Sequence, residues 1–260
     1  MNQPLPKPLS TRCLLPVALA AALLVSACGN SDPAAMLTSA RDYLAKNDAP
    51  AAIIQLKNAL QEDPNLGEAR LLLGQALLGS GDPVGAETEL KKAADLGVSA
   101  DLVTPPLVRS RLMQGKFKQV TDEHAGKSLG TPEAQAELLT LVAQAWRAQG
   151  NAAEFETAVN AALQARADHE PALIEQARLK ASKRDVDGAI GVLDALLAKR
   201  PTSHEALKLK GDLLLGGKRD VPGALTAYRA AVQAYPGYAE GQASVVRTLM
   251  GDRQLDAAGP

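Results

Sequence analysis

The stretch PAAMLTSARDYLAKNDAPAAIIQLKNALQEDP, residues 33–64, decides the fold. Two segments with apolar residues at three- and four-residue spacing, 34–46 and 51–61, predict two helices joined by a turn at 47–50. Pro64 ends the unit, because a proline inside a helix removes a backbone hydrogen bond and clashes with the preceding turn. Such a hairpin cannot bury its apolar faces alone, so the sequence predicts further hairpins stacked against it.

The same residue types return along the chain at a fixed period. The position of Ala52, early in the second helix, recurs at steps of 34 or 35 residues as Ala86, Val120, Phe155, Ala189, Ala224 and Ala258. Prolines expected to close the units keep the same register at Pro64, Pro132, Pro201 and Pro236. We therefore expect about six full repeats plus a partial seventh, near 33–66, 67–100, 101–135, 136–169, 170–203, 204–238 and 239–260.

This period and pattern resemble the tetratricopeptide (TPR) repeat. The second unit matches through Leu73, Gly74, Leu77, Ala86 and Leu90. The sixth matches through Gly211, Ala224, Tyr228 and Pro236, with one inserted residue in its turn at 216–222. The resemblance implies an all-α fold, a right-handed α-solenoid of TPR helical hairpins that occupies residues 33–260.

Three places depart from the regular repeat. Thr104-Pro105-Pro106 is expected to interrupt a first helix, and Phe155 fills a place usually reserved for alanine, so we expect local distortion in the third and fourth units. At the end, 245–250 predicts the first helix of a seventh unit, and 256–258 the start of its second. Either 240–251 caps the array, or the chain is the front portion of a longer array; the second interpretation is favoured.

Residues 1–27 read as a lipoprotein signal peptide. Lys7 and Arg12 precede the apolar run 14–25, which is too short to span a bilayer. The following Val25-Ser26-Ala27-Cys28 resembles the bacterial lipobox, which implies lipidation of Cys28 and a short tether at 28–32. Because Gly29 replaces the aspartate that favours retention in the inner membrane, we expect the outer membrane of a Gram-negative cell envelope. The alternatives are a plain signal cleaved near Ala27 and an uncleaved anchor.

Composition argues against several classes of function. Without segment 1–27, 26 Lys and Arg face 29 Asp and Glu, a net charge of −3 that does not suggest nucleic-acid binding. No cysteine follows Cys28, and His124, His169 and His204 are isolated in sequence, so we expect solvated histidines, no metal and no cofactor. Glu87 and Glu89 are interpreted as a solvated face. We therefore predict no catalytic residues and a non-enzymatic protein.

The best candidate surface is the wall formed by the predicted first helices, which in TPR proteins holds an extended peptide. One position per repeat gives a ladder of Arg41, Gln75, Arg109, Gln144, Arg178 and Asp212, suited to carboxylates, peptide backbone or sugar hydroxyls. One turn earlier, Leu37, Leu71, Pro105, Thr140, Ile174 and Lys208 are expected to form an adjoining apolar strip. The alternative is that the polar residues merely face solvent and the apolar ones pack between repeats.

At finer grain, the front of the chain resembles the TPR lipoproteins that accompany exosortase (PEP-CTERM) systems. The matching phrases are AAIIQLKNALQ at 51–61, EARLLLG at 68–74 and GKFKQV at 115–120. This resemblance implies a membrane-anchored scaffold for envelope proteins or extended peptides, linked to exopolysaccharide production or export and to protein sorting. Alternatives are a pilotin or outer-membrane assembly factor, and a glycan-modifying enzyme, which would need a carboxylate cluster in the groove.

Overall fold

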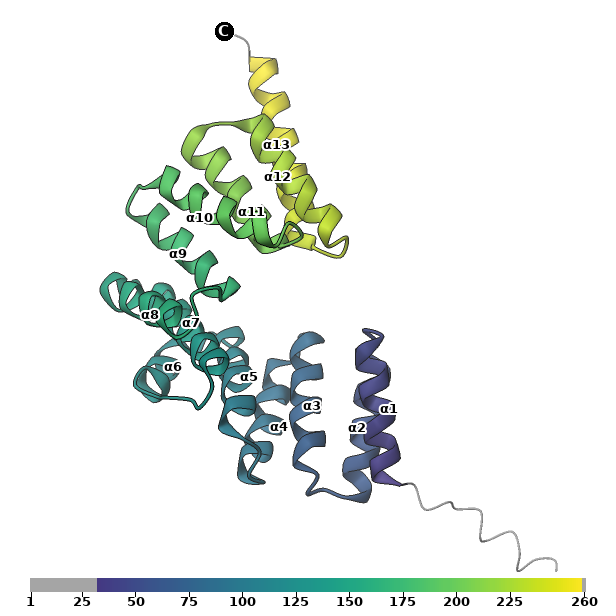
Figure 1. Ribbon diagram of the computed structural model, residues 1–260. Coiled ribbons are helices and arrows are strands. Elements are labelled where there is room, and N and C mark those ends of the chain that lie inside the picture. Colours follow the sequence, from purple (N-terminus) through teal and green to yellow (C-terminus); the bar gives the residue numbers. More distant parts are fainter. Residues whose placement is uncertain (1–31, 259–260) are drawn as a thin grey trace, which may run out of the picture.

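The structure, a computed structural model, describes residues 32–258, with side chains as far as Gly251 (Figure 1). Within this range it contains thirteen α-helices, one π-helical turn (η1) and no strand. The first six helices are α1 Pro33–Ala45, α2 Ala49–Glu62, α3 Gly67–Gly79, α4 Pro83–Asp95, α5 Ala100–Met113 and α6 Phe117–His124. The remainder are α7 Pro132–Ala148, α8 Ala152–Ala165, α9 Glu170–Ser182, α10 Val186–Lys199, α11 His204–Leu213, η1 Leu214–Lys218, α12 Val221–Ala234 and α13 Ala239–Ala258.

Consecutive helices pair into antiparallel hairpins that stack in chain order. Each odd-numbered helix from α1 to α11 packs on the even-numbered helix that follows it, and α3, α5, α7 and α9 each also pack on the next odd-numbered helix. The array bends around α7–α9, so that the N-terminal hairpins (purple and blue) and the C-terminal hairpins (green and yellow) form two arms (Figure 1). The predicted α-solenoid of helical hairpins is confirmed. We call the surface made by the odd-numbered helices the first-helix face.

The turn within each hairpin explains why the period is so regular. One residue with positive φ precedes the second helix in all six hairpins: Asn47, Gly81, Gly115, Gly150, Arg184 and Arg219, again at steps of 34 or 35. In four of these turns the next residue is an aspartate whose carboxylate accepts a hydrogen bond from a backbone N–H of the new helix. A left-handed residue followed by an N-cap therefore reverses the chain at each repeat. Arginine costs about 1–2 kcal/mol in this conformation, where glycine costs nothing.

Two glycines are required by the close approach of paired helices. A Cβ atom on Gly74 would lie 2.5 Å from Leu90 Cγ, and one on Gly211 would lie 2.5 Å from Tyr228 Cε1. Real Cβ atoms do not approach so closely, so the large residue of the second helix fills the space that glycine leaves in the first. These are the same glycines that carry the resemblance to the repeat signature.

Two expectations about prolines were wrong. Pro105 and Pro106 do not interrupt the first helix of the third hairpin, because α5 continues through both. They lie close to the start of α5. Each proline lacks the N–H that would donate to a backbone carbonyl of the first turn, and one of these two carbonyls belongs to the exposed Leu102. Pro132 does not close the third unit but occupies the first position of α7, where its missing N–H has no helical partner to lose. The distortion of this hairpin lies in α6, which is only eight residues long.

Two irregularities remain, the inserted residue in the sixth turn and the expected seventh unit. The inserted residue in the sixth turn is accommodated as a π-helical turn, Leu214–Lys218. The expected break between two helices of a seventh unit is absent, since α13 is one helix from Ala239 to Ala258. No proline lies between Gly251 and Ala258, and a glycine inside a helix costs only about 1 kcal/mol.

A buried ionic cluster joins α4, α5 and α6, which corrects the expectation of a solvated Glu87. Its side chain is buried and meets Arg111 Nε at 3.2 Å, Lys116 Nζ at 2.7 Å and Lys91 Nζ at 2.8 Å. Burial acts to raise the pKa of Glu87, but hydrogen bonds from these cationic neighbours and from Gln114 outweigh it and hold the pKa well below its usual range.

His124 belongs to the same cluster and is buried, not solvated. Its Nε2 lies 2.9 Å from a guanidinium nitrogen of Arg111. Burial, with the positive charges of Lys127 and Arg111 nearby, lowers the pKa of His124 to about 4. The imidazole is therefore neutral at neutral pH and can accept a hydrogen bond from Arg111.

Candidate functional site

A hollow of about 310 Å³ opens on the first-helix face of repeats four to six. Three successive odd-numbered helices, α7, α9 and α11, form most of its wall, and the beginning of α13 completes it. The lining residues are Gln144, Arg147, Pro171, Ile174, Glu175, Arg178, Glu205, Lys208, Tyr238 and Glu240. Three cations and three carboxylates thus surround a small apolar patch.

Glu175 is the electrostatic centre of this hollow. Its side chain is only 3% exposed, and it accepts a hydrogen bond from Arg147 Nε at 3.0 Å. Arg178 approaches the other oxygen of the same carboxylate at 3.5 Å, yet its buried Nε atom has no hydrogen-bond partner. The guanidinium of Arg178 is therefore held in place but incompletely satisfied, a costly state for a buried polar atom.

Ion pairs between neighbouring odd-numbered helices explain why Arg178 differs from the other ladder arginines. Arg41 on α1 pairs with Glu68 on α3 at 2.5 Å, and Arg109 on α5 pairs with Glu137 on α7. Glu205 on α11 occupies the same register relative to Arg178 on α9. Among the described side chains, Glu205 makes no ion pair, since Arg178 turns instead toward Glu175. The third pair of this series, Arg178 with Glu205, is therefore not formed, and both residues line the hollow. We call this unformed pair the open rung.

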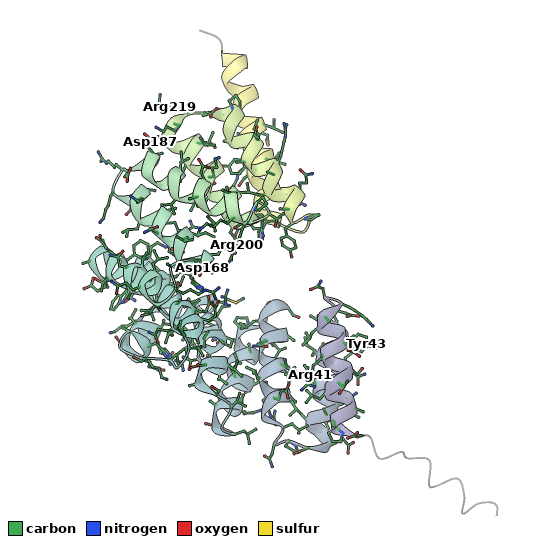
Figure 2. The ribbon with its side chains drawn as sticks, viewed as in Figure 1. Arg41, Tyr43, Asp168, Asp187, Arg200 and Arg219 are labelled. Carbon is green, nitrogen blue, oxygen red and sulfur yellow. The ribbon has the colours of Figure 1, made fainter. Side chains whose placement is uncertain are left out.

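The structure brings only part of the predicted ladder together. Gln144 and Arg178 of the ladder line the hollow, and Ile174 and Lys208 of the predicted apolar strip join them. Gln75 is exposed and does not line the hollow, whereas Arg41 and Arg109 are exposed but already paired with carboxylates. Figure 2 shows Arg41 on α1, in the arm opposite α9–α13.

The predicted apolar strip is corrected at four of its positions. Leu37 and Leu71 are 9% and 7% exposed and pack in the core between repeats, and Pro105 and Thr140 are also buried. Stacked hairpins use these positions to bury the apolar stripe of one helix against the next repeat. Ile174 is buried as well but still contributes to the wall of the hollow.

Sequence reasoning missed Arg147, Glu175 and Tyr238. A reading of one position per repeat finds Gln144 but omits Arg147, which lies on the same helix face one turn later. Glu175 could have been found in the same way, one turn before Arg178. Tyr238 comes from the turn between α12 and α13, and no periodic signal in the sequence predicts its approach to α9.

A second hollow, of about 380 Å³, adjoins the first at Pro171 and Glu205 and lies where α7, α9 and α11 begin. Its wall carries the carboxylates Glu133, Glu137, Glu170 and Glu205, the guanidiniums Arg166 and Arg200, and the imidazoles His169 and His204. The expectation of a solvated His169 was wrong, because its side chain is 5% exposed. Figure 2 places Arg200 and Asp168 at the bend between the two arms.

Two of the carboxylates of this second hollow, Glu137 and Glu170, are held in their charged form. Burial acts to raise the pKa of Glu137, but His169 and the guanidinium of Arg109 outweigh it and lower the pKa. Burial likewise opposes ionisation of Glu170, whose pKa is nevertheless lowered by hydrogen bonds from Ser203 and Arg200. Both groups are therefore anionic acceptors at neutral pH.

Two further properties concern ions and membranes. Among the described residues, no group of three or more His, Cys, Asp or Glu side chains is arranged to hold a metal ion. No helix within residues 32–258 is both long and apolar enough to cross a bilayer. Cys28, the predicted lipidation site, lies outside the residues that the structure describes.

Comparison with known families decides the assignment. Two family models described as tetratricopeptide repeat match the chain, one over residues 30–99 and the other over 174–239. The chain is a tetratricopeptide repeat protein. The two matched regions cover repeats one and two and most of repeats five and six, whereas the irregular TPR units three and four lie between them. No curated protein matches the sequence.

Solved structures with the same architecture come from distant proteins. Cut9–Hcn1 of the APC/C hetero-tetramer has 16% sequence identity and a TM-score of 0.66; the match covers 89% of this chain but 45% of that one. PilW, described as a type IV pilus biogenesis factor, has 16% identity and a TM-score of 0.60 over 82% of this chain and 98% of that one. PilF of Pseudomonas aeruginosa has 18% identity and a TM-score of 0.58, over 81% and 95% respectively. At these identities the likeness shows the TPR fold alone.

Proposed function

We propose that this TPR array is a lipid-anchored scaffold of the bacterial envelope that binds a protein partner in the hollow between α7, α9 and α11. The observation that carries this proposal is the open rung: the incompletely satisfied Arg178 lines the same hollow as Glu205, a carboxylate that makes no ion pair with any described side chain. A partner can supply hydrogen bonds to the Arg178 guanidinium and the Glu205 carboxylate without breaking the ion pairs that join the other repeats.

The hollow defines what such a partner must present. A carboxylate or backbone carbonyl would accept a hydrogen bond from Arg178, and an amide or ammonium group would donate to Glu205. Both groups occur on an extended polypeptide, and Ile174 and Pro171 offer a small apolar floor for one side chain. Hydrogen bonds to charged groups contribute about 1.5–3 kcal/mol each, so two such contacts suffice to position a segment.

The finer assignment is to exopolysaccharide production or export and exosortase-linked protein sorting at the outer membrane. It is supported by the lipobox-like sequence ending at Cys28 and by the phrases at 51–61, 68–74 and 115–120. A non-enzymatic role is supported by the state of the carboxylates. A glycoside hydrolase that works with a pair of carboxylates needs one carboxyl group with a raised pKa as its acid, whereas Glu137 and Glu170 have lowered pKa values.

The binding proposal is tested by Arg178→Gln with Arg41→Gln as its matched control. Both arginines occupy the same register, but Arg41 is paired with Glu68 at the far end of the array. We expect Arg178→Gln to reduce the amount of partner captured from solubilised envelopes by about tenfold, and Arg41→Gln to leave it unchanged. Captured proteins would be identified by mass spectrometry and both variants checked by thermal melting. Equal capture by wild type and Arg178→Gln would contradict the proposal.

The proposed lipid anchor is tested separately by the substitution Cys28→Ser. We expect this variant to leave the membrane fraction, since the acyl chains that would hold the array are then absent. If it sediments with the membranes as the wild type does, the lipid anchor is wrong while the binding site remains open to test. A secretin among the captured proteins would favour the pilotin alternative.

A further inference from the structure

Three aromatic rings meet at the surface beside the second hollow. His204, the first residue of α11, lies 5.0 Å from Tyr235 and 4.7 Å from Tyr238, measured between ring centroids, and the two tyrosine rings stack at 6.3 Å. The chain has only four tyrosines and one tryptophan, yet two of these tyrosines gather here. Tyr235 is 50% exposed, so core packing does not explain the cluster. We call these three residues the aromatic rim.

The aromatic rim connects the two hollows. His204 lines the larger hollow and Tyr238 lines the smaller one, and both hollows share Pro171 and Glu205. Each volume lies at the lower end of the range of about 300–1,000 Å³ that is usual for small-molecule sites. The arrangement is therefore a double hollow with His204 and Tyr238 at its dividing edge and Tyr235 packed against these two rings.

The wall of the larger hollow is unusual in being made of planar polar groups. Apart from Pro171, every lining residue carries a carboxylate, a guanidinium or an imidazole. Several of these groups are held in place by one another: His169 Nε2 is buried 3.1 Å from Glu137 Oε2, and Arg200 donates a hydrogen bond to Glu170. The planes of the carboxylates and guanidiniums are therefore fixed before a ligand hydroxyl binds to their remaining donor and acceptor positions.

We propose that the larger hollow and the aromatic rim bind a non-acidic saccharide. A sugar ring has one face of C–H groups, which packs on an aromatic ring, and an edge of neighbouring hydroxyls, which planar carboxylates and guanidiniums can bind in pairs. A peptide fits this wall less well, because within the hollow its apolar side chains would find only Pro171 and would otherwise depend on the aromatic rim. This site shares Glu205 with the open rung but does not use Arg178.

Charge narrows the class of sugar. The lining of the larger hollow carries four carboxylates and two guanidiniums, and Arg109 pairs with one of these carboxylates, Glu137, from outside the lining, so the wall keeps one negative charge in excess. Burying the carboxylate of a uronic acid or a phosphate against this wall would be opposed by repulsion. Neutral sugars avoid this cost, and an amino sugar would gain an ion pair. The hollow thus selects against acidic saccharides.

The test uses an array of immobilised oligosaccharides, neutral, amino-bearing and uronate-bearing, with proline-rich peptides as additional spots. The full chain, solubilised in detergent, is expected to bind neutral or amino-bearing spots and to leave the uronate spots empty. Tyr235→Ala should weaken this binding roughly tenfold, since a stacking contact is worth about 1.4 kcal/mol. Tyr43→Ala, on α1 in the opposite arm, is the matched control and should bind as the wild type does (Figure 2).

The outcomes separate this site from the protein-binding hollow. Arg178→Gln should retain saccharide binding even if it loses the protein partner, so failure of one proposal leaves the other standing. Thermal melting of Tyr235→Ala verifies that the half-exposed ring is not needed for folding. Binding of uronates or proline-rich peptides alone, no saccharide binding, or equal binding by the wild type and Tyr235→Ala would overturn the inference.

Discussion

Replacing Phe155 by alanine is expected to lower the free energy of unfolding by about 3–5 kcal/mol, the usual range for a buried phenylalanine. The substitution restores the residue type that the repeat pattern favours at this position, so a consensus argument would expect stabilisation. The structure argues the opposite. Phe155 on α8 is buried with Val120 of α6 and Leu138 of α7 and fills the space beside the short third hairpin.

The shift in the urea midpoint measures this loss. Ile54→Ala is the control, because Ile54 is 58% exposed and its truncation should change the free energy of unfolding by less than about 0.5 kcal/mol. An unchanged midpoint for Phe155→Ala would mean that α8 does not pack as described.

The second large effect is expected for Glu87→Ala. Removing this carboxylate leaves Arg111 buried with only Glu123 and His124 as charged or polar partners and leaves Lys116 unpaired. Breaking a buried ion pair from one side costs about 3–5 kcal/mol, and we expect the lower end because Arg111 keeps Glu123. The exposed pair of Glu156 with Lys183 is the control, and Glu156→Ala should cost less than about 1 kcal/mol.

The pH dependence of the Glu87 effect follows from the sign of its pKa shift. Because the folded state lowers this pKa, the stabilisation is fully present above the ordinary glutamate pKa of about 4.3 and is lost as pH falls below it. The difference in stability between wild type and Glu87→Ala should therefore shrink between pH 5 and pH 3. A difference that stays constant over this range would show that the carboxylate is not the stabilising group.

The sequence predicted the architecture well because the turn chemistry and the helix contacts share one period. The left-handed residue before each second helix, the aspartate caps and the glycines at 74 and 211 are local requirements, and each one can be read from its own repeat. The prolines were harder, since the same residue type can open a helix, as Pro132 does, or stand in its second turn, as Pro105 does.

The candidate site was predicted only in part, because it depends on how neighbouring repeats meet. The ladder reading found Gln144 and Arg178 from their spacing. It could not show that Arg41 and Arg109 are paired with glutamates of the next repeat, or that Glu175 draws Arg178 away from Glu205. Nor could it place Tyr235 and Tyr238 beside His204, since no spacing rule joins a turn to the start of an earlier helix.

The most direct test of the central claim is site-specific photo-crosslinking in living cells, with the photoreactive residue placed at Gln144 in the hollow. Gln75 is the matched position, because it has the same register in the second repeat, is exposed and lies outside the hollow. The account predicts a specific crosslinked protein from position 144 and none from position 75. Equal crosslinking from both positions, or none from position 144, would contradict the assignment of the hollow as the partner-binding site.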